Sequence, residues 1–153
     1  MTTSGSFTAV LDACVLLPPT LCDLLLRCCE TPRLMVPKWS SMILSEVHRN
    51  QVKKLGWPID LANHWRTEVE RSFPEAMVTR FEALISECKN HEKDQHVLAS
   101  AIVCQADAIV TLNVKDFPAH ALEDWAVDVK TPSQLLISFY EMRPTWIVGK
   151  LDD

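Results

Sequence analysis

Acidic side chains at four places in the sequence could do chemistry together. They are Asp12, Glu46, Asp94 and Asp116. Asp12 interrupts an apolar run at 7–14, where a carboxylate is costly to bury unless it is paired, hydrogen-bonded or bound to a cation. Clustered carboxylates repel one another unless a cation neutralises them, and oxygen ligands suit hard ions such as Mg²⁺ or Mn²⁺. Such a site can activate water and stabilise the oxygens of a phosphodiester during in-line displacement.

Each acid also has a simpler explanation. Asp12 could cap the turn that follows it, and Asp94 could interact with the dipole of the helix that it begins. Asp116 could form an Asx turn before the next proline. Glu46 borders the apolar face of its expected helix, where a solvated glutamate would normally lie on the opposite side. The functional hypothesis therefore depends on all four acids meeting at one place.

The elements that must position these acids alternate between strand and helix. We predict strands at 7–14, 34–36, 77–78, 108–112 and 126–129, and helices at 20–30, 41–55, 58–73, 81–86, 92–105 and 135–142. Thr20, and Ser40 or Ser41, are the expected helix caps. The alternation predicts one α/β domain over residues 1–153, with a central, mostly parallel sheet of about four to five strands between two helical layers. Asp12 and Asp116 should lie at the carboxyl edge of that sheet, where open α/β sheets bind ligands.

Composition argues against several classes of protein. With only 3 Gly, the chain has no Gly-rich phosphate loop. No apolar run is long enough to span a bilayer and no signal peptide is recognisable, so we expect a cytoplasmic protein with no membrane partner. The 6 Cys include no Cys-x-x-Cys pair, so reduced thiols are expected. A formal net charge of -5 argues against a general duplex-DNA binder.

Four sequence blocks contain the four acids and follow one another along the chain. They are VLDACVL at 10–16, WS and EVHRN within 39–50, KDQHVLASA at 93–101 and VTLNVKDFP at 110–118. In type and spacing they resemble PIN-domain proteins, in particular the bacterial VapC-like branch. The resemblance covers nearly the whole chain and implies a three-layer α/β/α PIN-like fold. Relatives often have Asp where His91 stands and Arg where Cys22 stands.

The resemblance implies a metal-dependent endoribonuclease that cleaves RNA with a metal-activated water and is usually the toxin of a toxin–antitoxin pair. Its catalytic metal ligands, for Mg²⁺ or Mn²⁺, would be the four acids named above, with Thr111 and Asn113 lining the site. Contacts to the RNA backbone could come from Arg49, Lys53 and Lys54, or from Lys89 and Lys93. The implied partners are RNA and a cognate antitoxin, and the helices at 41–73 could bind that antitoxin or a second copy of the chain.

Two other readings remain open. A phosphatase of the haloacid-dehalogenase type would need a second acid two residues after Asp12, where Cys14 stands. A non-catalytic PIN-like scaffold would be expected to have lost some of the four acids. His91 and His96 could suggest zinc, but their spacing is poor for shared coordination, so surface or capping roles are expected for both.

Overall fold

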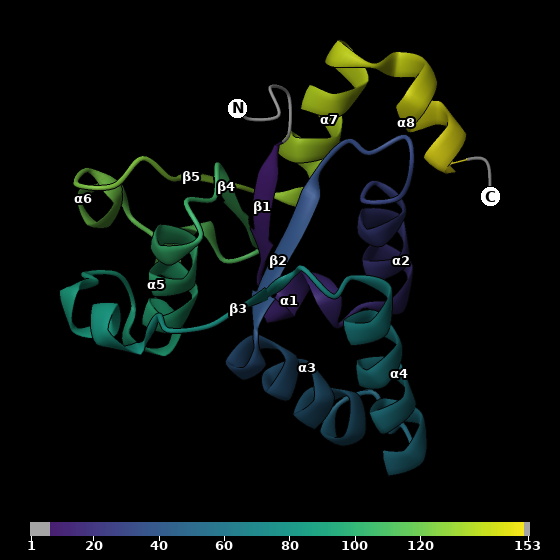
Figure 1. Ribbon diagram of the computed structural model, residues 1–153, viewed down its shortest axis with the longest axis horizontal. Coiled ribbons are helices and arrows are strands. Elements are labelled where there is room, and N and C mark those ends of the chain that lie inside the picture. Colours follow the sequence, from purple (N-terminus) through teal and green to yellow (C-terminus); the bar gives the residue numbers. More distant parts are fainter. Residues whose placement is uncertain (1–6, 152–153) are drawn as a thin grey trace.

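A computed structural model describes residues 7–151. In this part of the chain five strands form one sheet in the order β3-β2-β1-β4-β5, and every neighbouring pair is parallel (Figure 1). The strands are β1 (Thr8–Leu11), β2 (Val36–Ser40), β3 (Met77–Val78), β4 (Ala108–Val110) and β5 (Asp128–Lys130). The predicted α/β fold with a sheet of four to five strands is therefore confirmed, and it is consistent with a PIN fold.

Helices follow or precede each strand. They are α1 (Ala13–Leu16), α2 (Pro19–Arg27), α3 (Ser41–Lys53), α4 (Ile59–Ser72), α5 (Gln95–Val103), α6 (Ala119–Leu122), α7 (Pro132–Met142) and α8 (Pro144–Leu151), with short 3₁₀ helices η1 (Glu82–Glu87), η2 (Glu92–Asp94) and η3 (Val114–Asp116). Helix α5 packs against β1, β2 and β4, whereas α7 packs against β5 and α2 against α8. Figure 1 shows α2, α7 and α8 on the opposite side of β1 and β2 from α5.

The central strand β1 is buried on both faces. Ala9, Val10 and Leu11 are fully buried, because β1 pairs with β2 on one side and β4 on the other while helices cover both faces. A continuous apolar run is the pattern expected for such a strand. The chain turns directly after Leu11, so the residue that follows, Asp12, lies at the carboxyl edge of the sheet.

Several element boundaries differ from the sequence prediction. The second strand was expected to end before Pro37, but β2 continues through it. Proline is tolerated there because the edge strand β3 is short and pairs only with Trp39 and Ser40, beyond the proline. Helix α2 begins after Pro18 instead of being capped by Thr20. Helices α1, α6 and α8 were not predicted.

Two further expectations concern membrane-spanning helices and the state of the cysteines. Within residues 7–151 no helix is both long enough and apolar enough to cross a membrane. The predicted location in the cytoplasm stays a prediction. The six cysteines are free thiols, as expected, and Cys22, Cys28, Cys29 and Cys88 are buried.

Candidate active site

Asp12 is held in place by two hydrogen bonds. It is 4% exposed and caps the short helix α1, where its Oδ1 accepts from the Ala13 amide at 2.8 Å. Its Oδ2 accepts from the Thr111 hydroxyl, also at 2.8 Å, and Thr111 directly follows β4. These bonds join the carboxyl ends of two neighbouring strands. Asp12 thus has both the expected capping role and the expected position at the sheet edge.

A thiol completes the polar contacts around Asp12. Cys14 Sγ lies 3.3 Å from Thr111 Oγ1 and accepts from the Leu112 amide at 3.3 Å. Burial and the neighbouring Asp12 carboxylate both raise the pKa of this thiol. Cys14 is therefore a neutral neighbour of the carboxylate at pH 7. Sequence reasoning noted this position only because a phosphatase would need an acid there.

Helix α3 positions Glu46. The helix begins after Ser40, whose hydroxyl accepts from the Ile43 amide at 3.2 Å, so the first of the two expected caps is the one observed. Ile43 and Val47 are fully buried, and Glu46 between them is half-buried at the border of that face. Since β2 ends at the cap of α3, Glu46 lies close to the same sheet edge as Asp12.

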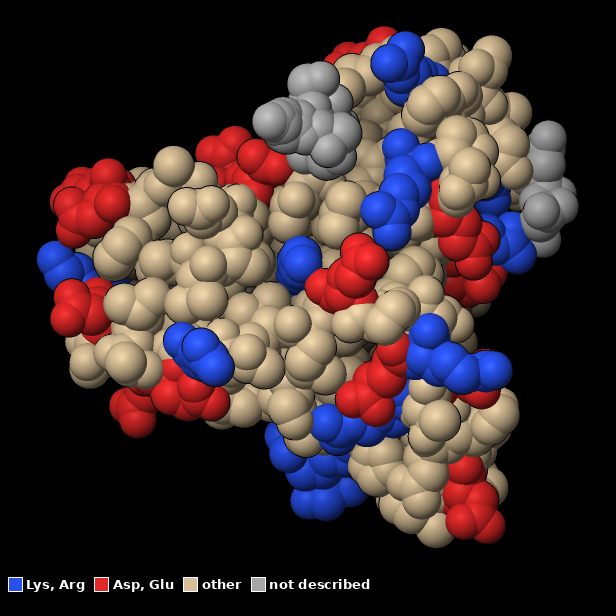
Figure 2. All heavy atoms as spheres, viewed as in Figure 1, with Lys and Arg blue, Asp and Glu red and all other residues tan. Residues whose placement is uncertain are grey.

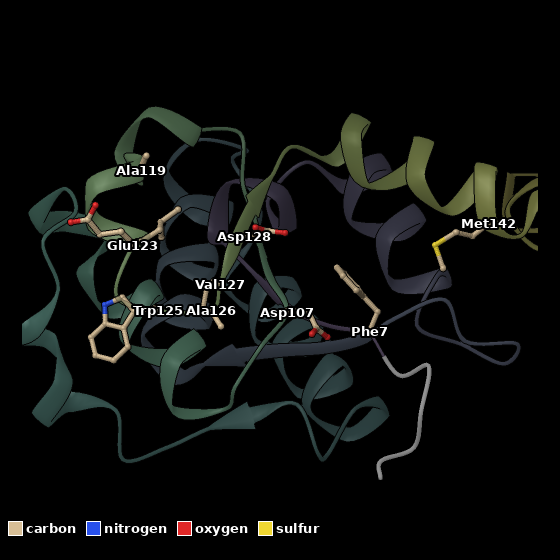
Figure 3. Close-up of a pocket in the computed structure, with 10 residues that line it drawn as sticks. Phe7, Asp107, Ala119, Glu123, Trp125, Ala126, Val127, Asp128 and Met142 are labelled. Carbon is tan, nitrogen blue, oxygen red and sulfur yellow. The ribbon is translucent and has the colours of Figure 1, made fainter.

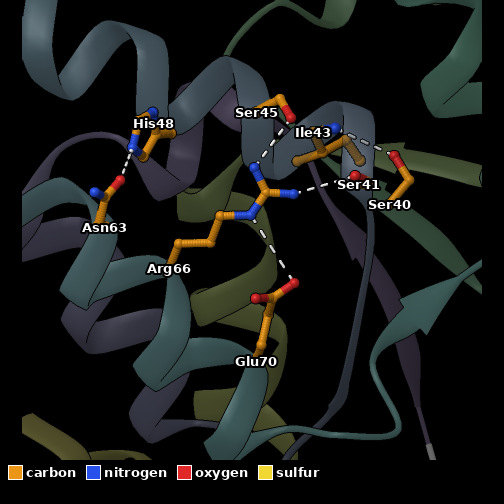
Figure 4. Close-up of polar contacts among 8 residues, drawn as sticks. All are labelled: Ser40, Ser41, Ile43, Ser45, His48, Asn63, Arg66 and Glu70. Carbon is orange, nitrogen blue, oxygen red and sulfur yellow. Dashed lines mark hydrogen bonds and ion pairs between the residues drawn. The ribbon is translucent and has the colours of Figure 1, made fainter. Parts of the chain in front are cut away.

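Polar contacts fix helix α4 against α3 (Figure 4). The Arg66 guanidinium donates to the hydroxyls of Ser41 and Ser45 at 3.1 and 3.0 Å. One turn further along α3, His48 Nε2 lies 2.6 Å from Asn63 Oδ1. These contacts join successive turns of the two helices, so α4 supports the helix that carries Glu46.

Asp94 stands at the junction of η2 and α5. It is 9% exposed, and its amide donates to the carbonyl of His91 at 2.9 Å. Asn90 Nδ2 donates to the Asp94 carbonyl at 3.0 Å. His91 Nδ1 accepts from the Lys93 amide, so the capping role expected for His91 is confirmed. Backbone contacts on both sides therefore hold Asp94 at the amino end of α5.

Asp116 reaches the same place from the loop after β4. It ends η3, and its carbonyl accepts from the His91 amide at 3.1 Å. The Asp116 carboxyl group is one of the neighbours that raise the pKa of Asp94. Like charges that lie close together repel, so the Asp116 carboxylate opposes the ionisation of Asp94.

The four acids interact electrostatically. Burial raises the pKa of Asp94 to about 7, and Asp12, Asp116 and Glu46 add to the shift. Burial also raises the pKa of Asp12, although the hydrogen bonds from Thr111 and Ala13 oppose the rise. Carboxylates that lie close together and partly buried, without a neutralising cation, have raised pKa values of this kind.

His96 is a neighbour that the sequence prediction misjudged. It was expected at the surface or as a cap, but it is 8% exposed and the cap of α5 is Asp94. Its Nδ1 has no hydrogen-bond partner. Burial lowers the pKa of His96, and the carboxylates of Glu46 and Asp12 oppose that shift. The available signal was its place directly before the buried pair Val97 and Leu98.

The donor set fits a divalent cation by its chemistry. The four acids supply carboxylate oxygens, and bound positive charge would relieve the repulsion that helps to raise the pKa of Asp94. In the described residues, no three His, Cys, Asp or Glu side chains are arranged so that they could hold one metal ion as they stand. Their mutual effects on pKa values indicate that the acids lie near one another, without a ready ligand geometry.

The predicted substrate contacts have different surroundings. Thr111 is fully buried, and its hydroxyl is used by Asp12 and by the amide of Asn113. Asn113 and Arg49 are exposed. Arg49 follows Glu46 by three residues on α3, and Lys53 follows by seven, so both extend from the acid along one side of the helix. Figure 2 shows basic side chains gathered at the end of the molecule where Figure 1 draws α3.

A large cavity lies elsewhere. It has a volume of about 890 Å³ and is lined by apolar residues together with Asp107, Glu123 and Asp128 (Figure 3). Phe7, which precedes β1, also lines it, and Asp107 and Asp128 lie at the starts of β4 and β5. The cavity is therefore at the amino edge of the sheet, opposite to the four acids.

Comparison with known proteins gives one informative relative. No protein-family model matches the chain. Over 108 residues it is 33% identical to a Mycobacterium tuberculosis protein named "Putative ribonuclease VapC50", and the match covers 65% of this chain and 63% of that protein. The chain thus matches less than two thirds of the relative's length. It is a distant homologue of a VapC protein, which confirms the resemblance to the PIN-domain family found in the sequence.

Proposed function

We propose that the chain is a divalent-metal-dependent endoribonuclease, the toxin of a toxin–antitoxin pair. The observation that carries this proposal is the burial of Asp12 and Asp94, with Asp12 at the carboxyl edge of a parallel sheet and bound there by the Thr111 hydroxyl from the neighbouring strand. The homology to a protein named a ribonuclease agrees with it. We assign Asp12, Glu46, Asp94 and Asp116 as the metal-binding and catalytic acids.

Each acid has a part that follows from its surroundings. Asp12 presents carboxylate oxygens whose orientation is set by the Ala13 amide and the Thr111 hydroxyl. Asp94, whose pKa is raised to about 7, would give up its proton when positive charge binds, and Asp116 and Glu46 complete the group from η3 and α3. A bound divalent ion would supply water activation and charge neutralisation at the phosphodiester. No Ser, Cys or His nucleophile is required.

The proposed contacts to RNA lie on α3. Arg49 and Lys53 are exposed, and both follow Glu46 on one side of the helix. Cations in such a line can bind successive phosphates of a single strand and lead it to the acids. We assign Arg49 to RNA backbone binding and Asn113, exposed after β4, to the rim of the site. Thr111 acts through Asp12 and is a positioning residue.

The proposed binding surface for a protein partner lies on α3 and α4. Met42, Leu55, Ile59 and Leu61 are large apolar residues exposed on or next to these helices. An amphipathic segment of an antitoxin could cover them, as could a second copy of the chain. Size-exclusion chromatography with light scattering distinguishes a dimer from a monomer that awaits its partner.

Cleavage of RNA is the direct test. The purified chain, Asp12→Asn and Asp60→Asn are incubated with single-stranded and structured RNAs in Mn²⁺, Mg²⁺ or EDTA. Asp60 is an exposed carboxylate in the first turn of α4, so its variant is a matched control. We expect cleavage that leaves 3′-hydroxyl ends with the wild type and the control, and loss of cleavage in EDTA and in Asp12→Asn. Equal cleavage by Asp12→Asn would refute the assignment.

A second measurement separates the enzyme from a scaffold. If no RNA is cut, calorimetric titration with Mn²⁺ asks whether the acids bind metal at all. Binding that Asp12→Asn abolishes would indicate a narrow RNA specificity. Absence of binding would favour the non-catalytic PIN-like module.

A further inference from the structure

The cavity at the amino edge of the sheet has no part in the proposed chemistry. Its volume of about 890 Å³ lies within the range of binding sites for other molecules. A second cavity of about 320 Å³ adjoins it, since Asp107 and residues 125–127 line both. The second cavity is also lined by Ile102 from α5. Together the two cavities form a groove that we call the amino-edge groove.

Apolar side chains from separate elements line this groove. Trp125 lies at one end of the larger cavity, and Phe7 and Met142 lie toward the other (Figure 3). Met142 is 71% exposed, and Trp125 and Phe7 are half-buried. A hollow with exposed apolar side chains commonly marks a place where another molecule binds, and tryptophan is among the residues that contribute most to such contacts.

The charges in the groove have one sign. Asp107, Glu123 and Asp128 line it, and all three are exposed. The Thr8 amide donates to one carboxylate oxygen of Asp107 at 2.8 Å, which fixes this side chain directly before β4. In the described part of the chain these three acids take part in no ion pair, and no Lys, Arg or His is among the described lining residues. The groove therefore repels phosphate groups, and positive charge complements it.

We propose that the amino-edge groove binds a basic, amphipathic segment of a partner protein, one that combines Lys or Arg with large apolar residues. Figure 3 places Asp107 and Asp128 between the apolar side chains at the two ends, so cations in the middle of the segment face these acids and its apolar residues cover the ends. Separated acids with apolar surface at both ends exceed what one small cation can contact, which favours a segment of chain.

The position of the groove separates it from the proposed active site. It lies at the opposite edge of the sheet from Asp12, so a partner can bind there without covering the four acids. This inference goes beyond the proposed nuclease function and does not depend on it.

Selection from a displayed library of random short peptides, with the full chain as bait, tests the inference. We expect the enriched peptides to combine Lys or Arg with Trp, Leu or Phe. Glu123→Gln with Asp128→Asn should weaken binding of a selected peptide about threefold to tenfold in fluorescence anisotropy, because each exposed ion pair contributes little and two are lost. Glu82→Gln with Glu87→Gln is the matched control, since both acids are exposed and line neither cavity.

Two readouts examine the apolar part of the groove. Met142→Ser should weaken peptide binding about tenfold, because the buried area of one large apolar side chain is lost. The side chain is exposed in the free protein, so the variant should fold like the wild type. In NMR spectra the Trp125 indole signal, assigned with Trp125→Phe, should shift when the peptide is added.

Several outcomes would overturn the inference. They are a selection that enriches no peptides or peptides without basic residues, equal weakening by the control and the groove variants, and an unchanged Trp125 signal, which would place the peptide on another surface. Displacement of the peptide by spermidine at similar concentration would assign the groove to a small cation instead. None of these measurements involves metal binding or RNA cleavage, so a failure here leaves the proposed nuclease function standing.

Discussion

Replacement of Asp94 by asparagine should stabilise the metal-free protein at neutral and alkaline pH. The Asp94 carboxyl is buried beside three other acids, and its pKa rises from 3.8 to about 7. In the folded state it therefore keeps a proton that it loses in the unfolded chain. Asparagine has the shape of the protonated acid but never becomes charged.

The sign and size of the effect follow from linkage. Between pH 3.8 and pH 7 the folded state binds more protons than the unfolded state, so wild-type stability falls as pH rises through this window and is level above it. A shift from 3.8 to about 7 corresponds to about 4 kcal/mol at pH 8. Because part of the shift comes from neighbouring carboxylates, we expect Asp94→Asn to gain about 2–4 kcal/mol at pH 8 and almost nothing near pH 4.

Urea unfolding in EDTA from pH 4 to pH 8 measures this difference. Asp60→Asn serves as the control for loss of an exposed carboxylate and should follow the wild type. Addition of Mn²⁺ at pH 8 should stabilise the wild type by mass action and have little effect on Asp94→Asn. If the stabilities of the wild type and Asp94→Asn change in parallel with pH, the acids do not share a buried site and the reasoning fails.

Three further outcomes are expected. Ser40→Ala removes the cap of α3 and should lower the free energy of unfolding by about 1 kcal/mol in urea titrations. Thr111→Val removes the donor to Asp12 and should cost about 1.5–3 kcal/mol at pH 8, whereas Thr111→Ser should behave like the wild type. In an Asp12→Asn background, Arg49→Gln with Lys53→Gln should weaken RNA binding measured by fluorescence anisotropy and reduce its salt slope by about 1.4; an unchanged slope would exclude the α3 contact.

Much of the architecture is predictable from local pattern. The apolar run before Asp12 fits a strand buried on both faces, and the helix from Ser41 has its cap and core face encoded within a few residues. The Thr131 capping box at the start of α7 is equally local. These features depend on the chain's own periodicity and capping, so they can be recognised without knowledge of the fold. The continuation of β2 through Pro37 could not be recognised, because it depends on where the edge strand stops.

Sequence by itself determined which acids the protein has and that strand and helix alternate so as to bring Asp12 and Asp116 to one sheet edge. Only the tertiary structure decided how the acids affect one another: the burial of Asp94, the Thr111 hydroxyl on Asp12, and the burial of His96. The physical reason is that the pKa of an acid depends on its distance from other charges and on its desolvation. Both are set by packing between segments up to about a hundred residues apart, such as Asp12 and Thr111.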